Sequence, residues 1–125
     1  MKKLILLVKR KPGLTAEQFR EYYEKTHTQL ALKLLPGFKS YQRNYVRHDL
    51  TYRPAHIEAR PIEPNFDVIV EMTFETDDDY QKMARTLADP NISRQIVEDG
   101  ERFMDRGSMQ MFFVDEEKTE ELNPK

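Results

Sequence analysis

The stretch that decides the fold is LTAEQFREYYEKTHTQLALKLLPGF, residues 14–38. Thr15 is followed three residues later by Gln18, a capping-box pattern that predicts a helix from about Ala16 to Leu34. The proline and glycine of LPGF should end it, because both are poor helix formers. At 100° per residue its apolar side chains form one stripe, made of Phe19, Tyr23, Leu30 and Leu34.

Strands are predicted on both sides of this helix. LILLV, Leu4 to Val8, is apolar on both faces and predicts a central strand. Phe38 to Val46 alternates, which puts Tyr41, Arg43 and Tyr45 on one face and Asn44 on the other. Two further strands are expected, at Phe66 to Glu75 and at Ser108 to Glu117.

The second half of the chain also contains two helix signals. Thr76, followed by three aspartates, predicts a helix from about Asp77 to Leu87, since carboxylates favour the positive end of a helix dipole. ADPN then predicts a helix from about Asn91 to Met104. Between the middle strands, His48 to Asn65 has three prolines, two histidines and no sustained period, and so predicts a long loop of the kind that forms lids or binding loops.

The resulting order, β-α-β-loop-β-α-α-β, matches the ferredoxin-like (βαββαβ) topology, an α+β fold with an antiparallel sheet and its helices on one face. We expect a single domain at residues 1–117, with 48–65 as a loop insertion and 118–125 as a polar tail. The bare sheet face predicts a homodimer, because large apolar patches are rare on monomers.

Composition narrows the partners. The 125 residues have a net charge of −2 with acids and bases interspersed, so neither nucleic acid nor an anionic membrane is an expected partner. No apolar run approaches the ~18–20 residues of a membrane span, and MKKLILLVKRKP is too short for a signal peptide. The sequence has no cysteine, which excludes disulfides and thiolate nucleophiles, and we expect a cytoplasmic protein.

Several segments together resemble the EthD-like family of dimeric α+β barrel proteins: LLVKRKPGLTAEQFREYYEKTH, LPGFKSYQRNYV, FDVIVEMTFE, LADPNISRQIVEDGERFMDR and FFVDEE. The resemblance covers roughly residues 2–117. It implies two ferredoxin-like subunits joined through their sheets, each with a pocket between sheet and helices. Family relatives include cofactor-free polyketide cyclases, fungal dehydratases, a methylmuconolactone methylisomerase and accessory proteins of ether degradation. The insertion at 48–65 is longer than the family's usual connection, which leaves the substrate open.

His27, at the border of the helix stripe, is the candidate catalytic residue. Its ordinary pKa of ~6.5 lies near neutral pH, which suits a general acid/base, and the resemblance matches it to the family's helix histidine. The alternative is a helix-border histidine bonded to a loop. For His48 and His56 three roles are open: a second acid/base, metal binding, or simple exposure to solvent. Exposure is the default for histidines on a loop, and we therefore predict no metal site.

The candidate substrate-binding residues are Tyr23, Tyr41, Asn44, Asp67 and Phe103. Asp67 and Glu71 would share one strand face, as a polar pocket or as a solvated, paired surface. An apolar cavity or an ordinary core would be built from Phe19, Tyr22, Tyr23, Phe103, Met83, Met104 and Met111. EDGERFMD, Glu98 to Asp105, is interpreted as a solvated helix face, with Asp99 and Glu101 paired to basic residues and without chemistry.

The leading hypothesis is a cofactor-free enzyme of the lyase, cyclase or isomerase type that acts on an aromatic, lactone or polyketide-like metabolite. His27 would transfer the proton, and Asn44 or Tyr41 would hold a carbonyl or phenol oxygen. One alternative is a non-catalytic small-molecule-binding or accessory protein of a degradation pathway. Another is a heme-handling protein that uses a histidine ligand.

Overall fold

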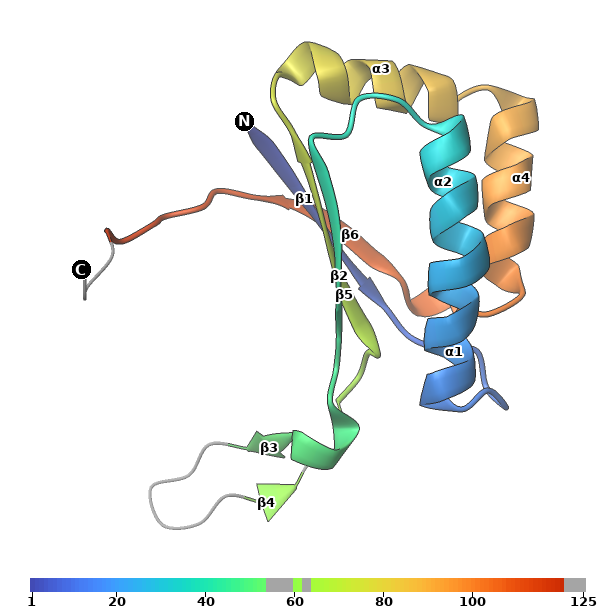
Figure 1. Cartoon of the computed structure of the whole chain (residues 1–125), viewed down its shortest axis with the longest axis vertical. Coiled ribbons are helices and arrows are strands. Elements are labelled where there is room, and N and C mark those ends of the chain that lie inside the picture. Colours follow the sequence, from blue (N-terminus) through green and yellow to red (C-terminus); the bar gives the residue numbers. More distant parts are fainter. Residues whose placement is uncertain (54–59, 62–63, 121–125) are drawn as a thin grey trace.

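The computed structural model describes residues 1–53, 60–61 and 64–120, and it has the predicted α+β architecture (Figure 1). Four antiparallel strands form the sheet in the order β2-β5-β1-β6. These strands are β1 (Lys2–Val8), β2 (Ser40–Tyr45), β5 (Val68–Phe74) and β6 (Gln110–Val114). The helices all cover one face of this sheet, and the other face is left open (Figure 1). The ferredoxin-like fold class is therefore confirmed.

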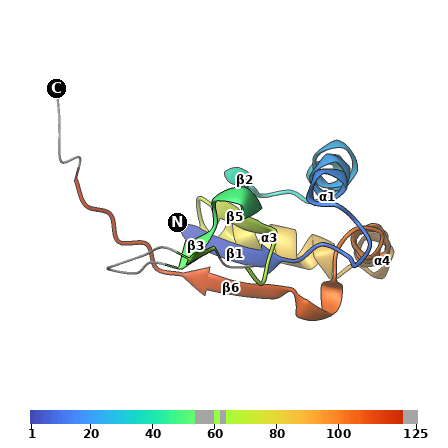
Figure 2. The same cartoon turned by 90° about the horizontal axis from the view of Figure 1, so that it is seen from below.

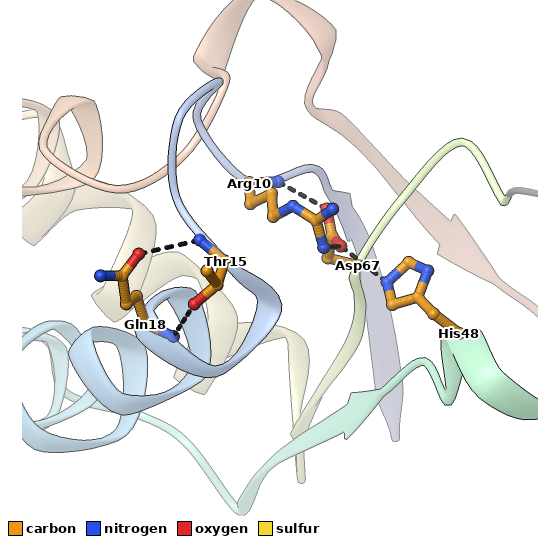
Figure 3. Close-up of polar contacts among 5 residues, drawn as sticks. All are labelled: Arg10, Thr15, Gln18, His48 and Asp67. Carbon is orange, nitrogen blue, oxygen red and sulfur yellow. Dashed lines mark hydrogen bonds and ion pairs between the residues drawn. The ribbon is translucent and has the colours of Figure 1, made fainter.

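The first helix begins where the sequence predicts. Thr15 Oγ1 accepts a hydrogen bond from the Gln18 backbone N–H at 3.1 Å, and Gln18 Oε1 accepts one from the Thr15 N–H at 2.9 Å (Figure 3). This reciprocal capping box starts α1 (Ala16–Tyr22), which continues through a π-helical turn (Tyr23–His27) into α2 (Thr28–Leu34).

The π-helical turn changes which residues are buried. A π turn takes more residues than an α turn, so side chains four apart stay in line through it. The buried stripe is therefore Phe19, Tyr23, His27 and Ala31. Leu30 and Leu34, which a regular α-helix would place in that stripe, are only half-buried. The turn thus moves His27 from the border of the stripe into the interior.

The later elements differ from prediction mainly at their ends. α3 (Asp77–Leu87) has the predicted bounds, and the Thr76 side chain caps it by accepting from the Asp79 N–H. α4 (Pro90–Glu101) ends three residues early, because residues 102–104 turn back and Met104 bridges to Arg10. β6 is shorter than the predicted strand.

The predicted long loop also contains regular structure. A short 3-10 helix (His48–Leu50) is followed by β3 (Tyr52–Arg53), which pairs antiparallel with β4 (Arg60–Pro61). This ribbon projects from the end of the sheet (Figure 1). The segment predicted as a long loop from His48 to Asn65 thus contains short regular elements at these residues.

The core lies between the sheet and the helix pair formed by α1–α2 and α4, which run side by side (Figure 2). One buried cluster contains Val8, Phe19, Tyr23, Val68, Val70, Phe103 and Met104. A second, toward α3, contains Leu4, Phe74 and Met83. No helix in the described part of the chain is long and apolar enough to cross a membrane.

Candidate active site

A cavity of about 230 Å³ lies between the helix-facing side of the sheet and the helices. Most of its walls are apolar and come from β1, β5, β6, the three helices α2, α3 and α4, and the segment between α4 and β6. They include Leu4, Leu6, Ala31, Leu35, Met72, Met83, Ile96, Val97, Met104, Met109 and Met111. Few polar side chains interrupt this lining. They are Tyr23, His27, Tyr41, Ser93 and Arg106.

His27 is held in this wall by contacts on several sides. The residue is 7% exposed, and its ring lies 5.5 Å from that of Tyr23 and 5.0 Å from that of Phe103, measured between centroids. His27 Nδ1 lies 2.9 Å from Asp99 Oδ2. Since an ionised carboxylate can only accept a hydrogen bond, Nδ1 carries the proton and Nε2 keeps its lone pair. Among the described residues none hydrogen-bonds to Nε2.

Asp99 is the partner that sequence reasoning missed. It lies in α4 and is 5% exposed, whereas the sequence predicts a solvated helix face for the acidic run around it. Tyr22 donates its hydroxyl proton to Asp99 Oδ1 at 2.6 Å, and Arg102 Nη1 lies 3.6 Å from the same oxygen. The carboxylate is therefore fixed from both sides, and it orients the imidazole from the side away from the cavity.

The environment keeps His27 neutral near neutral pH. Burial lowers the pKa of His27 below its usual value, because the charged imidazolium loses its hydration. Asp99 acts in the opposite direction by hydrogen bonding and charge, and the positive charge of Arg106 adds to the lowering. A neutral imidazole with a free nitrogen is the form in which histidine accepts a proton.

Two phenols stand at the same cavity. The Tyr41 hydroxyl donates to the Tyr23 hydroxyl oxygen at 3.3 Å, a long hydrogen bond between β2 and the π-helical turn. Burial raises the pKa of Tyr23 well above its usual value and also raises the pKa of Tyr41. Both phenols therefore stay protonated. Because Tyr41 donates its single proton to Tyr23, the Tyr23 hydroxyl is the one left to donate to a ligand oxygen.

The other predicted binding residues lie elsewhere. Phe103 packs behind His27 without lining the cavity. Asn44 is on the open face of the sheet, where its side-chain amide donates to Glu71 Oε2 at 3.0 Å. Of the predicted apolar lining, Met83, Met104 and Met111 do face the cavity, while Phe19 and Tyr22 pack outside it.

Asp67 belongs to a separate cluster at the end of the sheet (Figure 3). Asp67 Oδ2 accepts from the Arg10 backbone N–H at 2.7 Å, and Oδ1 lies 3.0 Å from Arg10 Nη1 and 2.8 Å from His48 Nε2. The structure therefore does not bring Asp67 or His48 to His27. His56 lies outside the described residues. Within the part of the chain that is described, no group of three metal-ligating side chains is assembled.

Comparisons with known proteins agree with this fold. The model of the EthD domain family matches residues 11–107. A relative from Metarhizium robertsii, named conidial pigment biosynthesis dehydratase EthD, is 26% identical over 113 residues, which cover 86% of this chain and 78% of the relative.

Solved structures of low sequence identity share the fold. An EthD family protein from Bacillus halodurans superposes with a TM-score of 0.59 at 17% identity, covering 94% of this chain and all of that one. HapK from Hahella chejuensis has a TM-score of 0.59 at 8% identity, covering 99% of this chain and all of its own. SnoaB from Streptomyces nogalater, a cofactor-independent oxygenase, has a TM-score of 0.54 at 9% identity, covering 96% of this chain and 98% of its own.

Proposed function

The chain belongs to the EthD domain family, and from that premise we propose that it is a cofactor-independent enzyme of the lyase, cyclase or isomerase type with His27 as its general base. The observation that carries this proposal is the 2.9 Å contact between His27 Nδ1 and Asp99 Oδ2 at the wall of an apolar cavity. A carboxylate in this position fixes the imidazole tautomer and stabilises the imidazolium formed during proton transfer. His27 is then the catalytic residue, and Asp99 is its positioning residue.

Dehydration is the reaction that these groups suit best. Nε2 of His27 would remove a proton from a carbon next to a ketone, and the electron pair would move to the carbonyl oxygen as an enolate. Tyr23, kept protonated by burial, would donate its hydroxyl proton to that oxygen, and Tyr41, which donates to the Tyr23 oxygen, would strengthen this hydrogen bond. The enolate would then expel a β-hydroxyl group, which takes the proton from the imidazolium and leaves as water.

Among lyase, cyclase and isomerase, the Metarhizium relative supports a lyase of the dehydratase type, since its name assigns it a dehydratase step in pigment biosynthesis. Cavity size favours a small ligand. At about 230 Å³ the cavity lies below the range of ~300–1,000 Å³ typical of sites for drug-sized molecules, so a compact one- or two-ring substrate is favoured over heme. The apolar walls fit an aromatic or polyketide-like carbon skeleton.

Proton exchange tests the proposal without knowledge of the natural substrate. A two-ring ketone such as 2-tetralone, incubated in D₂O with the protein, should exchange its α-protons faster than in buffer alone, as followed by ¹H NMR. His27→Gln should reduce the catalysed exchange by about 10²–10⁴-fold, the usual contribution of a general base.

His48→Gln is the matched control, because the same substitution is made at a histidine bonded to Asp67 at the other end of the sheet. It should leave the exchange rate unchanged. Binding of the ketone with no acceleration of exchange, or equal exchange in wild type and His27→Gln, would contradict the enzyme assignment and favour a non-catalytic binding protein.

The open face of the sheet supports a homodimer as the second part of the proposal. On β1, Ile5 and Leu7 alternate with the buried Leu4 and Val8 and so point away from the helices. Ile5 pairs with Phe112 on β6, which is 41% exposed in the single chain. A second copy packed on this face would remove these apolar groups from water.

A further inference from the structure

The cavity contains one permanently charged side chain, and no acidic group of the described residues pairs with it. Arg106 lines the cavity from the turn between α4 and β6. Its guanidinium makes no hydrogen bond or ion pair with any residue that the structure describes. By contrast, Arg10, Arg43 and Arg47 each lie within 3.0 Å of a carboxylate oxygen. Arg106 is half-buried, and a guanidinium at the wall of an apolar cavity without a counter-ion is suited to a ligand of opposite charge.

The Arg106 side chain runs close to the pair formed by His27 and Asp99. It crosses α4 at Gly100, the residue directly after Asp99, where a Cβ atom would lie 3.4 Å from Arg106 Cδ and 3.5 Å from Met104 Sδ. Both distances are ordinary van der Waals contacts, so the arginine side chain packs directly over this residue of α4. Arg106 is also close enough to act on the charge of His27.

The number of charges in the cavity lining limits the charge that a ligand can carry. Near neutral pH the lining holds one full positive charge, because His27 is neutral and the Tyr23 and Tyr41 phenols are protonated. One guanidinium matches one carboxylate, with two parallel N–H···O bonds. A phosphate dianion would leave a negative charge unmatched among apolar walls.

We propose that Arg106 determines specificity by pairing with a carboxylate on the substrate, so that the site takes an aromatic or polyketide-type acid. This inference rests on the proposed function, since it names the substrate class of the same cavity. The carboxylate anchors one end of the molecule at Arg106, and the carbon that loses its proton lies toward His27 Nε2. Such two-point placement orients a flat, otherwise apolar molecule that hydrophobic contact alone would leave free to rotate.

Binding of matched acid and amide probes tests the inference separately from catalysis. The probes are benzoate, 2-naphthoate and 2-anthroate, each with its neutral carboxamide, titrated at pH 7.5 and followed by calorimetry or by NMR shifts of the cavity methionines. Wild type should bind the best-fitting acid at least tenfold more tightly than its amide. Arg106→Met should reduce this preference to within about twofold, and Arg106→Lys should keep part of it.

Arg94→Met is the control, since it removes an equal charge from an exposed position of α4 outside the cavity. It should retain the full preference. Equal binding of acid and amide by wild type, a preference that survives Arg106→Met in the folded variant, or no binding of any acid would overturn the inference. Should Arg106→Met fail to fold, the wild-type comparison and Arg106→Lys still decide.

The two proposals fail in different ways. Loss of α-proton exchange with an intact, Arg106-dependent preference for acids would reject the enzyme but keep the carboxylate site. His27→Gln should keep the acid preference, because the anchoring charge belongs to Arg106. Exchange of 2-tetralone by a protein that shows no preference for acids would reject the carboxylate site alone.

Discussion

His27 links the stability of the protein to pH. Its pKa is lowered in the folded state by burial, so between that value and the unfolded value of ~6.5 the unfolded chain binds more protons. The free energy of unfolding should therefore be highest, as far as His27 affects it, above about pH 6.5. It should fall as the pH is lowered from about 6.5 through the pKa of His27 in the folded state. For one proton, the slope is at most about 1.4 kcal/mol per pH unit.

The measurement is denaturant unfolding between pH 7.5 and 5 for wild type and His27→Gln. The variant should show a shallower loss of stability on acidification, because it has no imidazole to charge. Parallel curves for the two proteins would mean that folding does not lower the pKa of His27.

At the residue scale the sequence indicated that His27 lies near the interior, but it did not indicate its partner Asp99. His27 is visible as a histidine near an apolar stripe, a local pattern within one helix. Asp99 lies 72 residues away, and in the sequence its neighbours Glu98 and Glu101 resemble a solvated face. A glycine directly after an acidic residue within a helix was the one available signal that α4 packs closely there.

The alternation of side chains along β2 also indicates which candidate residues can reach one cavity. Tyr41 and Asn44 were both candidates for substrate binding, yet their spacing of three residues puts them on opposite faces of a strand. The structure places Tyr41 at the cavity and Asn44 on the open face. The pattern alone thus indicates that a single cavity cannot be lined by both.

Elements were predictable where local signals determine them. The caps at Thr15 and Thr76 fix where α1 and α3 begin, because a side chain there satisfies free backbone N–H groups. The π-helical turn at Tyr23–His27 was not predictable, since no residue pattern specifies it and packing selects it. That turn is what buries His27.

Gly37, in the connection from α2 to β2, gives a stability test at the element scale. Its φ is +97°, and a Cβ there would collide with the backbone carbonyl of Asp79 at the start of α3. Gly13 has a similar φ of +95°, but a Cβ there meets no atom within 4 Å. The two glycines thus separate backbone strain from close approach.

Gly37→Ala should lower the free energy of unfolding by about 2–4 kcal/mol, from strain plus a shift of α3, whereas Gly13→Ala should cost about 1 kcal/mol from strain alone. Urea unfolding of both variants provides the comparison. Equal costs would show that the packing of α3 against this connection contributes little.

At the scale of the whole molecule, the order of strands and helices was predictable from the sequence. The reason is that the period of apolar residues in each element follows from which side chains contact the core. The sequence could not reveal that residues around 52 and 60 pair as a ribbon, since two-residue strands carry no period.

The proposed homodimer has a direct test in Phe112. Phe112→Glu puts a charge on the open face and should convert a species with the mass of two chains into one with the mass of a single chain in sedimentation at micromolar concentration. Leu32→Glu, at a 50% exposed site on α2 away from the sheet, should leave the mass unchanged. A wild type that sediments as one chain would reject the dimer.

The most direct test of the central claim is the tautomer of His27 in ¹⁵N-labelled protein at pH 7.5. Long-range ¹H–¹⁵N spectra should show a protonated Nδ1 and an unprotonated Nε2, and Asp99→Asn should shift the ring toward the opposite tautomer, because an amide can donate to Nδ1. Glu98→Gln, an exposed neighbour, should change neither signal. A protonated Nε2 or an imidazolium in the wild type would contradict the assignment of His27 as the base that faces the cavity.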